Sequence, residues 1–376
     1  MSIAADPSQV PPAPEPGEPL IISRSEGAIA RITLSRPRAI NALNREMFLG
    51  LEAALAAARA DAPSAIVLDG AGERGFCGGG DIKELARGGA REILAIEYRV
   101  DHAVGFSPIP VVGFMDGVTM GGGIGLTGHA RHRVVTERSR LAMPEVRIGI
   151  IPDVGGHLLL ARAPGRLGEL LAITAGEMRA GDAIALGFAD HYVPSERLDG
   201  LRAALASGED PGTVCARFAE PAPEAPLLAT REWWEPIAET ALARAADDPK
   251  GALLRLLAAL DAAGAAGAPA ADDAARIATA VRGMCPTSVA VTLAQLDRTR
   301  RLGLGLTEVL RDDLRVVGRL APRADFAEGV RAQVIDKDRD PHWSPATVGE
   351  LDPAELAEIL HPELGPNEPP LELADL

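Results

Sequence analysis

Two glycine-rich segments are the first candidates for chemistry, because they bring backbone groups rather than side chains close to another molecule. The segment FCGGGDIKEL covers residues 76 to 85, and MGGGIGL covers residues 120 to 126. Glycine permits a close backbone approach, and N–H groups gathered at the start of a helix attract negative charge. Either segment alone is also typical of a simple turn. Their joint occurrence favours a shared site for a group that carries or develops negative charge.

Three acidic residues are candidates for acid–base or nucleophilic chemistry. Glu145 and Asp153 lie in MPEVRIGIIPDVGG (residues 143 to 156), and Glu97 lies in AIEYRVDHAVG (residues 95 to 105). A carboxylate can attack a carbonyl carbon or take a proton from water. Each residue also has a structural explanation. Glu145 can be a surface charge after a turn proline, Asp153 a helix N-cap, and Glu97 an exposed helix charge.

The elements that must position these residues are visible in the hydrophobic pattern. Residues 29 to 34 alternate as in a half-buried strand, and the apolar runs at 65 to 70, 111 to 115 and 133 to 135 are typical of buried strands. Asn44 can cap a helix whose apolar residues recur every three to four positions. The first 200 residues therefore predict an α/β fold.

Beyond about residue 200 the pattern becomes helical. Residues 287 to 320 have helical spacing, whereas 221 to 226 and 262 to 275 predict loops. The predicted organisation is a disordered Pro-rich tail at 1–18, a core at 19–200, a variable helical region at 201–283, a C-terminal helical region at 284–345 and a peripheral acidic tail at 346–376.

Composition restricts the partners and the compartment. The chain has 38 basic and 53 acidic residues and no basic stripe, so we expect no nucleic-acid partner. No apolar run approaches the length of a membrane span, so we expect no membrane partner. Three scattered cysteines, Cys77, Cys215 and Cys285, favour a reducing cytoplasm. The histidines match no metal-binding spacing, so we predict no metal site.

The two glycine segments and MPEVRIGIIPDVGG together resemble the crotonase superfamily over roughly residues 20 to 200. The resemblance implies a crotonase-type spiral of repeated ββα units, here followed by a helical C-terminal region. It also implies that the N–H groups of Gly80 and Gly122 form an oxyanion hole for a thioester oxygen. Such prepositioned donors can contribute about 3 kcal/mol each where negative charge develops.

One departure from the superfamily bears on the reaction. Its hydratases resemble one another in two glutamates, one shortly after the GGG run and one in the PE segment. Here Gly125 occupies the first place and Glu145 the second, so the pair that adds water to a double bond is incomplete. IIPDVGG, AIEYRVDHAVG and the C-terminal part instead resemble the 3-hydroxyisobutyryl-CoA hydrolase branch. This implies Glu145 and Asp153 as catalytic residues and Glu97 as a substrate-binding residue.

The expected activity is hydrolysis of a short branched acyl-CoA, 3-hydroxyisobutyryl-CoA first, without a metal or redox cofactor. Arg36, Arg38 and Lys83 are candidates for contacting the CoA phosphates. Two alternatives stay open, an enoyl-CoA hydratase or isomerase and an acyl-CoA-binding protein without catalysis. Crotonase relatives are often trimers, so the resemblance is also compatible with a homo-oligomer.

Overall fold

The computed structural model describes residues 19–265 and 270–373, so the tail predicted at residues 1–18 lies outside the described residues. A six-stranded sheet has the order β1-β2-β3-β4-β6-β9, in which β1 is antiparallel to β2 and the other pairs are parallel. Its strands are β1 (Ile21–Glu26), β2 (Ile29–Leu34), β3 (Ala65–Gly70), β4 (Val111–Met115), β6 (His132–Val135) and β9 (His191–Tyr192). The short strands β5 (Val118–Met120), β7 (Arg140–Ala142) and β8 (Glu177–Met178) form a second sheet.

The helices of the first 220 residues surround these sheets. They are α1 (Arg45–Asp61), α2 (Ile82–Leu85), α3 (Ala90–Gly105), α4 (Gly122–Gly128), α5 (Gly156–Arg162), α6 (Leu167–Thr174), α7 (Ala180–Ala185), α8 (Leu198–Leu205) and α9 (Pro211–Phe218). The helix α1 begins where predicted, because the Asn44 side chain accepts a hydrogen bond from the Met47 N–H at 2.9 Å. The predicted strands at 29–34, 65–70 and 111–115 are confirmed with the same bounds.

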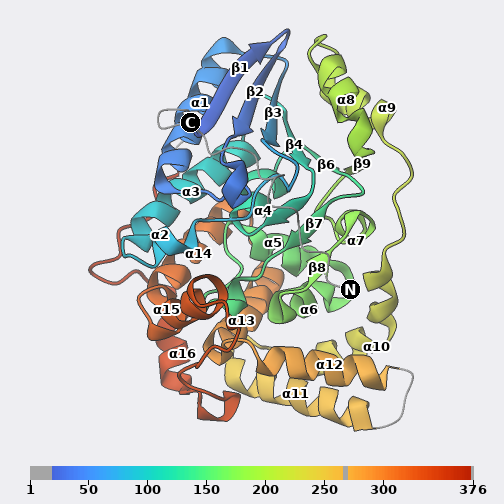
Figure 1. Ribbon diagram of the computed structural model, residues 1–376. Coiled ribbons are helices and arrows are strands. Elements are labelled where there is room, and N and C mark those ends of the chain that lie inside the picture. The colour runs from blue at the N-terminus through green and yellow to red at the C-terminus, as the bar shows by residue number, and fades with distance from the viewer. Residues whose placement is uncertain (1–18, 266–269, 374–376) are drawn as a thin grey trace.

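The described chain after residue 220 is helical. Its helices are α10 (Pro226–Ala241), α11 (Pro249–Ala265), α12 (Ala271–Arg282), α13 (Pro286–Leu302), α14 (Leu306–Leu320), α15 (Ala324–Val330) and α16 (Pro353–Ile359). Most of them lie below the large sheet in Figure 1. The loop predicted at 262–275 is wrong at both ends, since α11 continues to Ala265 and α12 starts at Ala271. Alanine has the highest helix propensity, and this stretch is rich in it.

The apolar side chains form two cores on opposite faces of the large sheet. The larger core joins α1, α3, α5 and α6 to the C-terminal helices, and the smaller one packs α8 and α9 against β3, β4 and β6. Leu351, Leu356 and Ile359, from the segment predicted to be a peripheral tail, belong to the larger core. The domain boundaries stay predictions.

No single helix among the described residues is long and apolar enough to cross a membrane, although α12 and α13, bent by 111° to each other, pass a test of length and composition as a pair. In α13 most side chains are buried in the protein core.

Candidate active site

A cavity of about 510 Å³ brings together most of the residues singled out in the sequence. The first glycine segment follows β3 of the large sheet and the second follows β5 of the small sheet, and an isolated bridge between Cys77 and Thr119 brings them together. The predicted site residues that line the cavity are Gly80, Gly122, Glu97, Glu145, Asp153, Arg36 and Lys83. Arg38 is not part of the described cavity wall.

The glycine segments lie against each other and against two carboxyl groups. A Cβ atom on Gly121 would lie 2.8 Å from Glu145 Oε1, and one on Gly122 would lie 2.3 Å from Glu97 Oε1. Gly121 also has a φ of +48°, which favours glycine. Residues 121 and 122 must therefore be glycine for the two glutamates to approach the backbone.

Gly80 and Gly122, whose N–H groups were predicted to bind an oxygen, line the same cavity. Gly122 is the first residue of α4, where an N–H has no acceptor within the helix. Within the described part of the chain neither N–H donates a hydrogen bond. Both donors are thus available to an oxygen placed between the two segments, and their role as an oxyanion hole stays a prediction.

Glu145 is buried at the start of a short 3₁₀ turn, Glu145–Arg147, and is not the surface charge that a turn proline alone would suggest. Its Oε2 atom has no hydrogen-bond partner among the described residues. Burial, followed by the charge of Asp153, raises the pKa of Glu145 well above its usual value. A carboxyl group with a raised pKa holds a proton more readily than an exposed one, which suits an acid–base role.

Asp153 is also buried and does not cap a helix. The N-cap of α5 is Gly155, which makes no side-chain cap, whereas Asp153 Oδ2 accepts a hydrogen bond from the Tyr98 hydroxyl at 2.5 Å. Burial and the charge of Asp313 raise the pKa of Asp153 to about 7, although the Tyr98 hydrogen bond opposes this rise. Asp153 is thus held in one orientation and titrates near neutral pH.

Glu97 lies on the buried face of α3 and lines the cavity, so it is not an exposed helix charge. Burial and then the charge of Asp153 raise its pKa well above the usual value. Glu97, Glu145 and Asp153 therefore line one cavity. Like charges this close cannot all ionise easily, so the three carboxyl groups titrate as a coupled set.

Asp101, which the sequence reading missed, fills the space next to Gly125. A Cβ atom on Gly125 would lie 2.6 Å from Val154 Cβ and 2.9 and 3.0 Å from the two Asp101 carboxyl oxygens. Position 125 is therefore closed rather than open for a glutamate. Asp101 is four residues after Glu97, so their shared helix face was the available signal.

The cationic candidates differ in their availability. Arg36 forms a 2.8 Å ion pair with Asp81, whereas Lys83 is exposed. Arg147, not singled out in the sequence, also lines the cavity, and the one hydrogen bond of its side chain among the described residues goes to the Ala175 carbonyl at 3.3 Å. Its position two residues after Glu145 was the signal. Lys83 and Arg147 are the cations in the described wall with the fewest competing partners.

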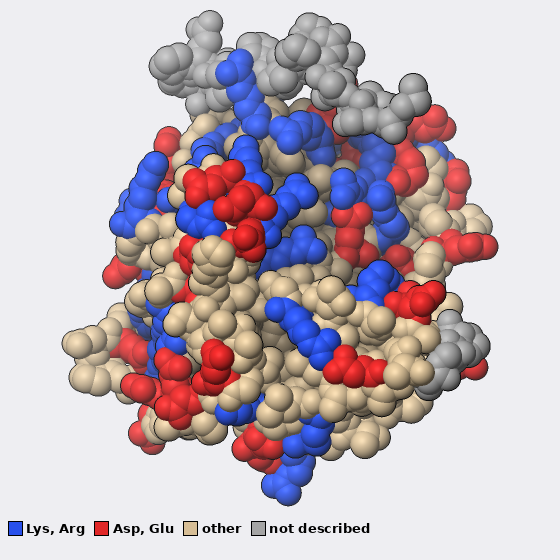
Figure 2. Space-filling model, turned by 60° about the horizontal axis from the view of Figure 1, so that its bottom comes forward, with Lys and Arg blue, Asp and Glu red and all other residues tan. Residues whose placement is uncertain are grey.

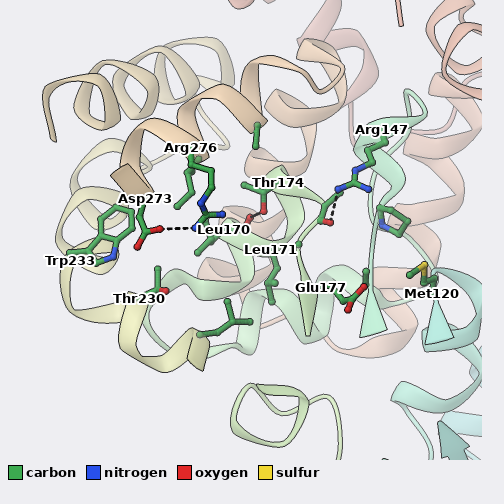
Figure 3. A pocket seen from close by; sticks show the side chains of 17 residues that line it. Met120, Arg147, Leu170, Leu171, Thr174, Glu177, Thr230, Trp233, Asp273 and Arg276 are labelled. Carbon is green, nitrogen blue, oxygen red and sulfur yellow. Dashed lines mark hydrogen bonds and ion pairs between the residues drawn. The ribbon is translucent and has the colours of Figure 1, made fainter. Parts of the chain in front are cut away.

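A second cavity, of about 460 Å³, shares Met120, Pro144 and Arg147 with the first. Figure 3 shows Met120 and Arg147 at one end of this cavity and Trp233 and Asp273 at the other. Its floor is apolar, and Arg276 and Asp273 pair at 2.8 Å on one side. The two cavities thus meet at a common wall.

Cys77 is buried beneath the first glycine segment. Burial raises the pKa of its thiol to about 12, and its Sγ accepts a hydrogen bond from the Gly79 N–H at 3.3 Å. A thiol that stays protonated is a weak nucleophile. Cys77 therefore supports the glycine segment by packing.

The chain is similar to several known proteins over most of its length. A mitochondrial 3-hydroxyisobutyryl-CoA hydrolase of Gallus gallus is 33% identical over 349 residues, which cover 88% of this chain and 86% of the relative. A carnitinyl-CoA dehydratase structure from Mycobacterium thermoresistibile has a TM-score of 0.83 and 36% identity, and covers 95% of this chain and 99% of its own. An enoyl-CoA hydratase structure from Rhodobacter sphaeroides has a TM-score of 0.80 and 38% identity, with 91% and 97% coverage.

The relatives also bear on the expected cellular location and on the expected fold. The curated relative is described as mitochondrial, so a cytoplasmic location stays a prediction. The solved relatives confirm the predicted α/β fold with a helical C-terminal region. Residues 29–360 match the sequence model of the enoyl-CoA hydratase/isomerase family. The chain therefore belongs to the enoyl-CoA hydratase/isomerase family, the crotonase superfamily that its glycine segments resemble.

Proposed function

We propose that this protein hydrolyses a short branched acyl-CoA thioester, with 3-hydroxyisobutyryl-CoA as the expected substrate and 3-hydroxyisobutyrate and CoA as products. The supporting observation is that two available N–H groups and the carboxyl groups of Glu145 and Asp153 line one cavity. The hydrolase name of the curated relative supports the substrate class.

In this proposal the thioester oxygen accepts hydrogen bonds from Gly80 and Gly122, which stabilise the negative charge that develops during attack. Glu145 acts at the carbonyl carbon in one of two ways. Its carboxylate attacks and releases the CoA thiolate, leaving a mixed anhydride that water then cleaves, or it takes a proton from the attacking water. Asp153, held by Tyr98, orients that water or the leaving thiolate.

The CoA part of the substrate carries phosphates on an otherwise acidic protein. Lys83 and Arg147 at the cavity wall are the first candidates for these contacts, with Arg36 partly committed to Asp81. Cationic side chains give charge-assisted hydrogen bonds to phosphate oxygens. In this proposal Glu97, which lines the cavity, accepts a hydrogen bond from a hydroxyl group on the acyl chain.

A hydratase is the second candidate, because the two solved relatives are named as a hydratase and a dehydratase and three carboxyl groups line the cavity. The residue at the position of the first hydratase glutamate speaks against this candidate. It is Gly125, and Val154 and Asp101 fill the space that a side chain there would need.

One assay separates these readings. Thiol release from a panel of short acyl-CoAs is followed with DTNB, beside the loss of crotonyl-CoA absorbance on hydration. We expect thiol release, fastest with 3-hydroxyisobutyryl-CoA, and little hydration. Hydration without thiol release would support the hydratase instead, and tight CoA-ester binding without either reaction would support a non-catalytic binding protein.

A further inference from the structure

The residue with the most unusual set of contacts outside the cavity is Asp313 on α14. Its side chain is fully buried. Its Oδ2 atom accepts a hydrogen bond from the Gly155 N–H at 2.9 Å, and its Oδ1 atom lies 2.7 Å from His157 Nδ1. The segment that directly follows Asp153 therefore donates one hydrogen bond to the Asp313 carboxyl group, through Gly155, and contacts its second oxygen through the His157 ring, without hydrogen-bond geometry.

That segment has a strained backbone. Val154 has a φ of +51° and Gly155 a φ of +72°. A left-handed conformation is rare for a β-branched residue and persists only where the surrounding structure enforces it. Contacts from outside the turn must therefore stabilise the Val154 conformation. The hydrogen bond from the Gly155 N–H to the Asp313 carboxyl group is such a contact.

Asp153 is held from two sides, by Tyr98 and by the turn that Asp313 contacts. On one side the Tyr98 hydroxyl of α3 donates to its carboxyl group, and on the other the strained turn is tied to α14. The helices α3 and α14 also pack against each other. The orientation of Asp153 is therefore set jointly by the core and by the C-terminal helical region.

We infer that Asp313 is a positioning residue for the reaction. Through Gly155 and His157 it holds the turn at Val154 and so keeps the Asp153 carboxyl group directed into the cavity. Asp313 does not line the cavity itself. The inference rests on the proposed hydrolysis, and it assigns to the C-terminal helices a direct part in building the active site.

The test compares Asp313→Asn with Asp312→Asn. Asp312 is the preceding residue on α14, is also buried, and pairs with Arg298 and Arg315 instead of with the Asp153 segment. Asp313→Asn is expected to lower kcat for thiol release at least about tenfold, because small misplacements of reacting groups are costly, while KM changes less than about threefold. Asp312→Asn is expected to lower the melting temperature but leave kcat near the wild-type value.

The pH profile gives a readout that a loss of stability would not move. The charge of Asp313 is the second cause, after burial, of the high pKa of Asp153. Removing that charge should move the acidic limb of kcat against pH to lower pH in Asp313→Asn and not in Asp312→Asn. The other titratable groups near Asp153 keep their chemical identity in both variants; they are Glu97, Tyr98, Asp101, Glu145 and His157.

Wild-type kcat and pH profile in folded Asp313→Asn would overturn the inference, as would equal effects in Asp312→Asn. If Asp313→Asn does not fold, His157→Gln decides, because it removes the side chain that contacts the same carboxyl group. A folded His157→Gln with wild-type kcat would overturn the inference, and a lowered kcat at unchanged KM would support it. Failure of the wild-type protein to release thiol would count against the proposed function itself.

Discussion

At the scale of single residues, the cavity concentrates carboxyl groups where the protein can least easily charge them. Glu97, Glu145 and Asp153 are all buried, and the pKa of each is raised first by burial. A buried carboxyl group opposes folding when it is ionised. Carboxyl groups with such strongly shifted pKa values are common at functional sites. Burying these carboxyl groups should therefore lower the free energy of unfolding, and replacing one of them should show this effect.

Asp153→Asn should separate stability from activity. The pKa of Asp153 is raised to about 7 in the folded protein, so the protonated carboxyl favours folding at low pH, and this contribution is lost as the pH rises through about 7. Asparagine cannot ionise and can still accept from Tyr98. The variant should melt at a higher temperature than wild type at pH 8, with a difference that shrinks toward pH 4, while thiol release falls. A stability difference independent of pH would contradict this.

Gly125 gives a second residue-scale prediction. Gly125→Ala should lower the melting temperature, because its Cβ atom would meet Val154 and the Asp101 carboxyl group, and overpacking of a core costs about 1–3 kcal/mol. Gly349→Ala is the matched control, since the nearest atom to its Cβ would be 3.8 Å away. Gly125→Glu should lose thiol release without gaining hydration. A stable Gly125→Glu variant that hydrates crotonyl-CoA would show that position 125 opens into the site.

At the scale of elements, the sequence predicted well what local pattern determines. The buried strands at 65–70 and 111–115 have continuous apolar runs, and α1 has a cap and a periodic apolar face. The contact between Asp313 and Gly155 joins residues 158 positions apart and leaves no local pattern. The glycine and proline residues at 262–275 predict a loop, but most of the described residues of this alanine-rich stretch are helical.

The C-terminal segment offers a test of how one element is held. Arg319 on α14 pairs with Glu368 at 2.7 Å and donates to the carbonyl groups of Glu358, Ile359 and His361. Arg319→Ala should lower the melting temperature and expose the chain after residue 350 to limited proteolysis. The control is Arg311→Ala, an exposed arginine on the same helix. Equal protease sensitivity of both variants would mean that Arg319 does not anchor this segment.

At the scale of the whole molecule, the net charge of −15 opposes an anionic substrate, so local cations must compensate. Figure 2 shows Lys and Arg interspersed with Asp and Glu on the face that it presents, rather than gathered in one basic stripe. Recognition of CoA phosphates should therefore depend on a few side chains at the cavity.

Lys83→Ala and Arg147→Ala should each raise KM for an acyl-CoA about threefold to tenfold, because each removes one charged phosphate contact. KM should be unchanged for the matching N-acetylcysteamine thioester, which lacks the phosphates. Arg38→Ala, outside the described cavity wall, is the comparison variant. If only Arg38→Ala raised KM, the CoA phosphates would bind near Arg38, in the segment that follows β2, and not at the cavity wall.

The role of Glu145 is the central claim of this account, and its isosteric replacement tests it most directly. Glu145→Gln keeps the shape of the buried side chain and should bind CoA esters and melt much as wild type does. Because the amide can neither attack the thioester nor accept a proton from water, kcat for thiol release from 3-hydroxyisobutyryl-CoA should fall by two or more orders of magnitude, on the order of 3 kcal/mol in the barrier. A folded Glu145→Gln protein with wild-type turnover would contradict the account.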